Sequence, residues 1–271
     1  MRTPWACPCC HGSLAESLRC PVCGRLWESQ RGFAWLVDDA EVVGSDRLMR
    51  RVYHYGAALH DPLLAATFRV FLGSSVAEAR QTILDRLATR PGDRVLEVGT
   101  GTGGNALRLV SQGVDYVGLD LAAGMLKIAR RRLDLAGYRH VPLGIADAHA
   151  LPLPDHAFDR VLHVGAVSSF RDPARAIAEM VRVAKPGATL VLVDEQLASN
   201  AKRTTRWAFA ASTLYATRGR CRPPEAIPGA EILGVERLTD FFYLIRAEVL
   251  PRPDHTPAPA WAPLGQPKAA C

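Results

Sequence analysis

Cysteines gather at the N-terminal end of this 271-residue chain, where five of its seven lie between Cys7 and Cys23. Cys7 with Cys10 and Cys20 with Cys23 form two C-x-x-C pairs. Four thiolates so arranged can surround one zinc ion, each sulfur about 2.3 Å from the metal. A module this short has too little apolar core to fold without a cross-link such as a bound metal ion. We therefore predict a structural zinc site made by Cys7, Cys10, Cys20 and Cys23.

Two alternatives at this site stay open. Cys9 or His11 could replace one of the four ligands. A C-x-x-C pair can also serve in redox chemistry, although no thioredoxin-like βαβ pattern surrounds either pair.

A glycine-rich loop is the second motif with chemical meaning. Gly99, Gly101 and Gly104 satisfy G-x-G-x-x-G after an apolar run, and Asp120 follows at a spacing of about 20 residues. Glycines let the backbone turn tightly against a ligand, and the acid accepts hydrogen bonds from ribose hydroxyls. This pattern alone predicts a nucleoside-containing cofactor, without distinguishing a dinucleotide from S-adenosylmethionine.

Glu97 favours S-adenosylmethionine. This carboxylate lies two residues before Gly99, where a pyrophosphate would instead prefer bare N–H groups and a helix N-terminus. S-adenosylmethionine carries an ammonium and a sulfonium and has no phosphate, so a nearby carboxylate is compatible with it. The sequence therefore predicts S-adenosylmethionine as cofactor.

Further motifs follow in order: Asp147-Ala148, the segment 151–159, and the segment 182–190 with Lys185-Pro186-Gly187. With the glycine loop they resemble class I S-adenosylmethionine-dependent methyltransferases, especially the group related to ubiquinone/menaquinone biosynthesis. The resemblance covers about residues 53–195 and departs at Ala188, where a second glycine is more usual. It implies methyl transfer, with donor contacts from Glu97, Gly99, Thr100, Gly101, Asp120, Leu121, Asp147, Ala148 and His163.

Strand-like and helix-like segments alternate from residue 94 onward, which predicts βαβ units. We expect an α/β fold: a Rossmann-like class I methyltransferase sheet with helices on both faces, plus a small N-terminal zinc ribbon. The predicted divisions are a zinc ribbon at 1–37, a helical linker or substrate lid at 38–90, the methyltransferase domain at 91–250 and a proline-rich flexible tail at 251–271. Expected strands are 94–98, 116–120, 141–145, 160–164, 188–194, 232–238 and 241–250, and expected helices 103–112, 123–135, 173–184 and 197–215.

The segment after the fourth strand, His163 to Phe170, should face the reacting methyl group. His163 is the candidate general base there, and a purely structural or donor-contacting role is the alternative. Tyr53, Tyr55, His60 and the segment 207–215 are candidates for a substrate lid, and core packing would explain them equally well.

Charge and composition leave the acceptor open. The sequence shows neither an apolar run long enough to span a membrane nor a signal peptide, so we expect a cytoplasmic protein. The stretch from Lys202 to Arg222 is basic and Arg130–Arg132 forms a second cluster, which suits a solvated surface or an anionic partner such as RNA or an acidic membrane surface. The ribbon also resembles that of ribosomal RNA guanine-N1 methyltransferases, although those usually end their ligand set in histidine where this chain has Cys23.

Three functions follow from these observations. The chain methylates a small molecule at O or C, such as a lipid-like compound or a secondary metabolite; or it methylates RNA; or it binds the donor without catalysis. The sequence leaves the oligomeric state undetermined.

Overall fold

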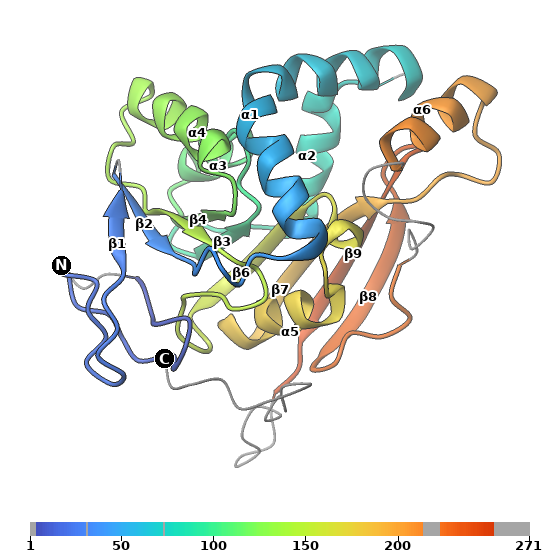
Figure 1. Cartoon of the computed structure of the whole chain (residues 1–271). Helices are drawn as coiled ribbons and strands as arrows, with labels where there is room; N and C mark the ends of the chain where they lie inside the picture. The colour runs from blue at the N-terminus through green and yellow to red at the C-terminus, as the bar shows by residue number, and fades with distance from the viewer. Residues whose placement is uncertain (1–3, 31, 73, 214–222, 252–271) are drawn as a thin grey trace.

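A single mixed sheet organises the described part of the chain. The computed structural model describes residues 4–30, 32–72, 74–213 and 223–251. Within them, nine strands follow the order β1-β2-β5-β4-β3-β6-β7-β9-β8 (Figure 1). All neighbours from β2 to β7 are parallel, whereas β1 and the pair β8–β9 are antiparallel to their neighbours. The strands are β1 Glu28–Gln30, β2 Phe33–Leu36, β3 Arg94–Val98, β4 Asp115–Asp120, β5 Leu143–Ala146, β6 Phe158–Val164, β7 Ala184–Glu195, β8 Ala230–Arg237 and β9 Phe242–Val249.

Helices cover both faces of this sheet, because the central parallel strands are apolar on both sides. Val95 and Leu162 pack in one core cluster with Ile83, Leu109 and Leu126, whereas their neighbours along the strands enter a second cluster. The helical elements are α1 Gly44–Thr67, η1 Phe68–Leu72, α2 Val76–Leu87, α3 Ala106–Val110, α4 Ala123–Leu135, η2 Val167–Ser169, α5 Pro173–Val183 and α6 Arg203–Thr213. The predicted Rossmann-like α/β class is confirmed.

Several element boundaries differ from prediction. The helix expected over 103–112 shortens to α3, because Gly103 has a positive φ of +79° and approaches Ala129 of α4 too closely for a side chain. Lys185-Pro186-Gly187 follows the helix expected over 173–184 and lies inside β7, which starts earlier than the strand expected from residue 188. The helix expected over 197–215 is α6, and residues 214 and 215 lie outside the described residues.

The N-terminal segment is joined to the main sheet. β2 pairs in parallel with β5, with Ala34 opposite Gly144, and the backbone N–H of Ala6 donates to the carbonyl of Pro152 at 2.8 Å. Trp5 and Trp27 share a core cluster with residues of the central strands. The division at residue 37 stays a prediction, but it does not coincide with a break in the sheet or the core.

The flexible tail predicted for 251–271 falls almost wholly outside the described residues. None of the described helices combines the length and apolar character that crossing a bilayer requires.

Candidate functional site

A cavity of about 290 Å³ opens at the carboxyl ends of the parallel strands, where α1 crosses their edge. Ligands of open α/β sheets bind at this edge, outside the strand ends. The predicted donor-contacting residues all line this cavity: Glu97, Gly99, Thr100, Gly101, Asp120, Leu121, Asp147, Ala148 and His163.

A hydrogen bond joins the glycine loop to the carboxylate of Asp120. Gly99 and Gly101 have positive φ angles of +77° and +57°, which side chains rarely adopt. The backbone N–H groups of Gly101 and Ala122 each donate to one carboxylate oxygen of Asp120, both at 2.8 Å. Burial raises the pKa of Asp120 in spite of these two bonds. Each oxygen retains acceptor capacity, so the carboxylate can also receive two ligand hydroxyls.

Glu97 is bonded inside the protein. Its side chain is only 1% exposed, and its oxygens accept from Asn105 Nδ2 at 2.8 Å and from the Tyr116 hydroxyl at 2.5 Å. Burial raises the pKa of Glu97 to about 7. The sequence reasoning treated this carboxylate as one that faces the donor, whereas its first partners are two other side chains.

Two residues that the sequence reasoning missed lie at the same end of the cavity. Asn105 Oδ1 is buried and accepts from no described residue. The guanidinium of Arg80, from α2, packs against Gly104 and occupies the space that a side chain at position 104 would need. Arg80 also lines the cavity. An unpartnered acceptor beside a cation suits the ammonium and carboxylate of an amino-acid group. The cavity therefore offers acceptors for ligand hydroxyls at Asp120, and an acceptor and a cation for an amino-acid group at Asn105 and Arg80.

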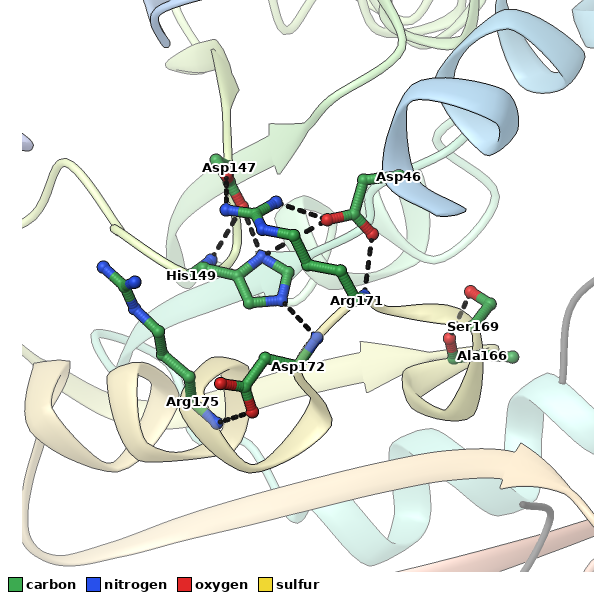
Figure 2. Close-up of polar contacts among 8 residues, drawn as sticks. All are labelled: Asp46, Asp147, His149, Ala166, Ser169, Arg171, Asp172 and Arg175. Atoms are coloured by element: carbon green, nitrogen blue, oxygen red, sulfur yellow. Dashed lines mark hydrogen bonds and ion pairs between the residues drawn. The ribbon is translucent and has the colours of Figure 1, made fainter. Parts of the chain in front are cut away.

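Asp147 belongs to a buried polar network, drawn in Figure 2. It accepts from His149 Nδ1 at 2.6 Å and from Arg171 Nη2 at 2.6 Å, and Arg171 also pairs with Asp46 of α1. His149 Nε2 accepts from the backbone N–H of Asp172 at 3.2 Å, so Nδ1 carries the proton. Burial alone would raise the pKa of Asp147, but the bonds from His149 and Arg171 hold it well below its usual range.

This network has the composition of a metal site but the contacts of an ion pair. Ligand atoms of Asp46, Asp147 and His149 lie within 4.8 Å of one another. The guanidinium of Arg171 bridges the two carboxylates, as Figure 2 shows, and so supplies the positive charge. The group fixes α1 to the loop after β5.

His163 is a neutral acceptor. Its Nδ1 lies 2.7 Å from the Val98 carbonyl, which can only accept, so Nδ1 carries the proton. Nε2 is buried and has no hydrogen-bond partner among the described residues. The residue itself lines the cavity, at the end of β6. Burial lowers the pKa of His163 to about 4, so the imidazole stays uncharged near neutrality.

Glu195, at the end of β7, was missed by the sequence reasoning. Its Oε2 is buried without a partner among the described residues, and its side chain lines the same cavity as His163. Burial, and then the neighbouring Asp194, raise the pKa of Glu195 to about 7. A second carboxylic acid directly after the expected strand 188–194, which ends in Asp194, was the available signal. The surrounding wall includes Phe68, Phe170, Leu238 and Phe242.

The predicted lid residues separate into two groups. Tyr53 and His60 line the cavity, and burial, with Glu195 and Asp120 nearby, raises the pKa of Tyr53 to about 12. Tyr55 and Trp207 are instead 84% and 69% exposed. Tyr215 lies outside the described residues.

The four predicted zinc ligands converge. The sulfurs of Cys7 and Cys23 are 3.7 Å apart, those of Cys10 and Cys20 are 3.4 Å apart, and all four lie within 4.8 Å of one another. Sulfurs bound to one tetrahedral zinc would lie about 3.8 Å apart. Cys9 and His11 are not part of this described cluster.

The basic clusters are only partly available to a partner. Arg130 donates to the carbonyls of residues 138, 139 and 141, and Arg132 pairs with Asp61. Lys202, Arg203 and Arg206 are exposed, whereas Arg218, Arg220 and Arg222 lie outside the described residues. RNA binding stays a prediction.

Comparison with known proteins gives a family match over the cavity-forming strands. Residues 96–192 match the model described as "Methyltransferase domain". Demethylmenaquinone methyltransferases from Renibacterium salmoninarum and Thermus thermophilus are 37% and 39% identical over 115 and 117 residues, which is 42% of this chain in both cases and 46% and 53% of theirs. The chain thus spans about half the length of these relatives.

A solved structure supports the fold. Phosphoethanolamine N-methyltransferase 2 from Haemonchus contortus, in complex with S-adenosyl-L-methionine, has a TM-score of 0.59 at 19% identity, over 78% of this chain and 61% of that one. The glycine loop, Asp120 and Asp147 all fall inside the matched residues. Residues 96–192 of this chain are therefore similar to a methyltransferase domain, and they fold as part of a Rossmann-like sheet.

Proposed function

We propose that this chain is an S-adenosylmethionine-dependent methyltransferase that acts on a small-molecule acceptor at O or C. One observation carries the proposal: the Gly99–Gly101 loop, Asp120, His163 and Glu195 all line a single cavity. His163 Nε2 and Glu195 Oε2 are buried atoms without a partner among the described residues. The matched methyltransferase domain supports the same reaction.

The residues around the glycine loop would bind the methyl donor. Asp120 receives the ribose hydroxyls, Asn105 Oδ1 receives the ammonium, and Arg80 pairs with the carboxylate. Bound there, S-adenosylmethionine supplies a methyl group on a sulfonium, ready for in-line displacement. The chain's own task is to hold an acceptor atom opposite that methyl and to exclude water.

Where the methyl acceptor would bind, Glu195 is a better general base than His163, the candidate that the sequence predicted. A base is most effective when its pKa lies near the working pH, and burial raises the pKa of Glu195 to about 7 while it lowers that of His163 to about 4. In this proposal Glu195 accepts the proton that a hydroxyl or an activated carbon loses, and His163 Nε2 accepts a hydrogen bond from the acceptor. The Phe68, Phe170 and Phe242 side chains favour a planar, apolar acceptor. A demethylmenaquinone-like molecule, as the relatives' names indicate, has this character.

We also propose a structural zinc ion at Cys7, Cys10, Cys20 and Cys23. The observed sulfur separations and the hydrogen bond from Trp27 Nε1 to Cys7 Sγ at 3.4 Å support a closed thiolate site.

The first test is donor binding. Asp120→Asn should weaken S-adenosylmethionine and S-adenosylhomocysteine binding by at least about tenfold, because a charged hydrogen bond is worth roughly 1.5–3 kcal/mol. Titration calorimetry measures both ligands. Asp115→Asn is the matched control, since Asp115 begins the same strand on the surface and should bind like wild type. Absence of binding to wild type, or equal binding by Asp120→Asn, would contradict the proposed donor site.

A further inference from the structure

The outer face of α1 is apolar. Leu48, Val52, Tyr55, Leu59 and Leu63 recur at spacings of four, three, four and four residues, which places them on one side of the helix. Leu59 and Leu63 are each 63% exposed. The apolar character continues at the helix end, where Val70 of η1 is 68% exposed. We call these six residues the α1 stripe.

The inner face of the same helix carries the polar groups. Asp46, Arg50, Tyr53 and His60 line the cavity. The apolar side chains of Met49 and Leu64 line the cavity as well, so α1 carries apolar groups on both sides, whereas an ordinary surface helix turns its apolar side only to the core. A contiguous exposed apolar patch of this kind marks a surface that contacts something.

Cations accompany the α1 stripe, and Asp39, the acid that lies beside them, is paired with Arg50. Arg47, Arg51 and Arg69 are exposed on α1 and η1. The two acidic residues of this segment are already paired, Asp46 with Arg171 and Asp61 with Arg132. The outer surface of α1 and η1 is therefore apolar and positively charged.

Helix α6 packs against η1, at the end of the α1 stripe. It lies next to η1, in the upper right of Figure 1, and Thr205 Oγ1 donates to the Phe71 carbonyl at 3.0 Å. Trp207 of α6 is 69% exposed, and Lys202 and Arg203 are exposed beside it. A tryptophan among cations is the composition found where proteins meet the bilayer interface.

We infer that the α1 stripe, with Trp207 and the flanking arginines, docks this protein on an anionic lipid surface. The leucines and Trp207 would enter the boundary between headgroups and acyl chains, and the arginines would contact phosphates. Charge complementarity selects this occupant, because an uncharged apolar partner would leave Arg47, Arg51 and Arg69 without counterions. Since α1 also covers the cavity, docking would present the cavity mouth to molecules dissolved in the lipid.

The test is co-sedimentation of the purified full chain with vesicles of phosphatidylcholine alone or mixed with phosphatidylglycerol. We expect binding to the mixed vesicles that weakens as salt is raised. Leu59→Gln/Leu63→Gln should bind at least about tenfold more weakly, because two leucines lose their burial. Arg51→Gln/Arg69→Gln should lose about fivefold for each arginine on mixed vesicles.

Leu233→Gln/Val235→Gln provides the matched control. These two residues are also exposed but lie on the edge strand β8, so the double variant should bind vesicles like wild type. Thermal unfolding and S-adenosylmethionine titration check that each variant is folded. They also separate the two proposals, because a protein that fails to bind vesicles can still bind the donor.

Three results would overturn the inference. Wild type could fail to sediment with mixed vesicles, or the α1 and β8 variants could lose binding equally. Light scattering could also show a dimer that Leu59→Gln/Leu63→Gln converts to monomer, which would make the α1 stripe an interface between two copies of this chain.

Discussion

Glu97 is buried and Glu195 is half-buried, and the two glutamates have similar pKa values but opposite environments. Glu97 accepts from Asn105 and Tyr116, whereas Glu195 Oε2 has no partner among the described residues. Burial raises the pKa of both to about 7. A buried polar atom without a partner costs stability, and such atoms persist where function requires them. Glu97 therefore organises the glycine loop, while Glu195 is free to meet a ligand.

Replacement of Glu195 should change how stability depends on pH. The folded-state pKa of Glu195 is raised above its unfolded value, so the stability it contributes is present below about pH 4.5 and is lost as the pH rises through about 7. Glu195→Gln removes this loss and should be more stable than wild type at pH 8, by on the order of 3 kcal/mol at most. Urea unfolding between pH 5 and pH 8 measures the difference.

The control variant is Glu231→Gln, because Glu231 is exposed on β8. Its stability should follow the wild-type pH profile. Parallel profiles for Glu195→Gln and wild type would show that Glu195 is already ionised in the folded protein, and would remove it as a base with a pKa near 7.

Among the elements, α1 depends on one arginine for its position over the cavity. Arg171 joins Asp46 near the start of α1 to Asp147 after β5, and both carboxylates are buried (Figure 2). The middle of α1 also approaches α4 closely, where the Gly124 N–H donates to His54 Nδ1 at 3.2 Å. The helix that covers the cavity is therefore held by polar contacts as well as by packing.

Loss of the Arg171 guanidinium should release α1. Arg171→Met leaves two buried carboxylates without their cation, which should cost about 3 kcal/mol of unfolding free energy. Proteolysis within α1 should accelerate, and donor affinity should fall because Asp147 lines the donor cavity. Urea unfolding and limited proteolysis measure these effects. Arg131→Met, an exposed arginine of α4, should stay within about 0.5 kcal/mol of wild type; an equal effect of both variants would contradict the role of Arg171.

For the molecule as a whole, the cysteine cluster and the central strands share one core. Trp5, Leu14 and Trp27 pack with Leu96 and Leu119 of the central strands. The carbonyl of Pro152 accepts from Ala6, and the next residue back, Leu151, lines the cavity. The cysteine cluster thus supports the loop that forms one wall of the cavity.

Zinc removal should therefore destabilise the entire domain. Elemental analysis should find one zinc per chain, and its chelation should lower the temperature of a single cooperative unfolding transition and weaken S-adenosylmethionine binding. Chelator already saturated with zinc is the control. Two separate transitions, with the donor-binding transition unchanged, would instead show an independent ribbon.

The sequence by itself determined the features that depend on local spacing. The C-x-x-C pairs, the glycine loop with Asp120, and the alternating strands and helices each follow from residues close together in the chain. These motifs predicted the α/β fold, the four converging cysteines and the donor-loop residues that line the cavity.

Only the tertiary structure decided which distant residues complete the site. Arg80 of α2, Asn105 before α3 and Glu195 at the end of β7 come together because these elements meet at the same edge of the sheet. Arg171 likewise bonds Asp46, which lies 125 residues away in the chain. The pairing of β2 with β5 and the outward side of α1 likewise depend on which neighbours cover each surface. A sequence pattern fixes the faces of a helix, but long-range packing decides which face is buried.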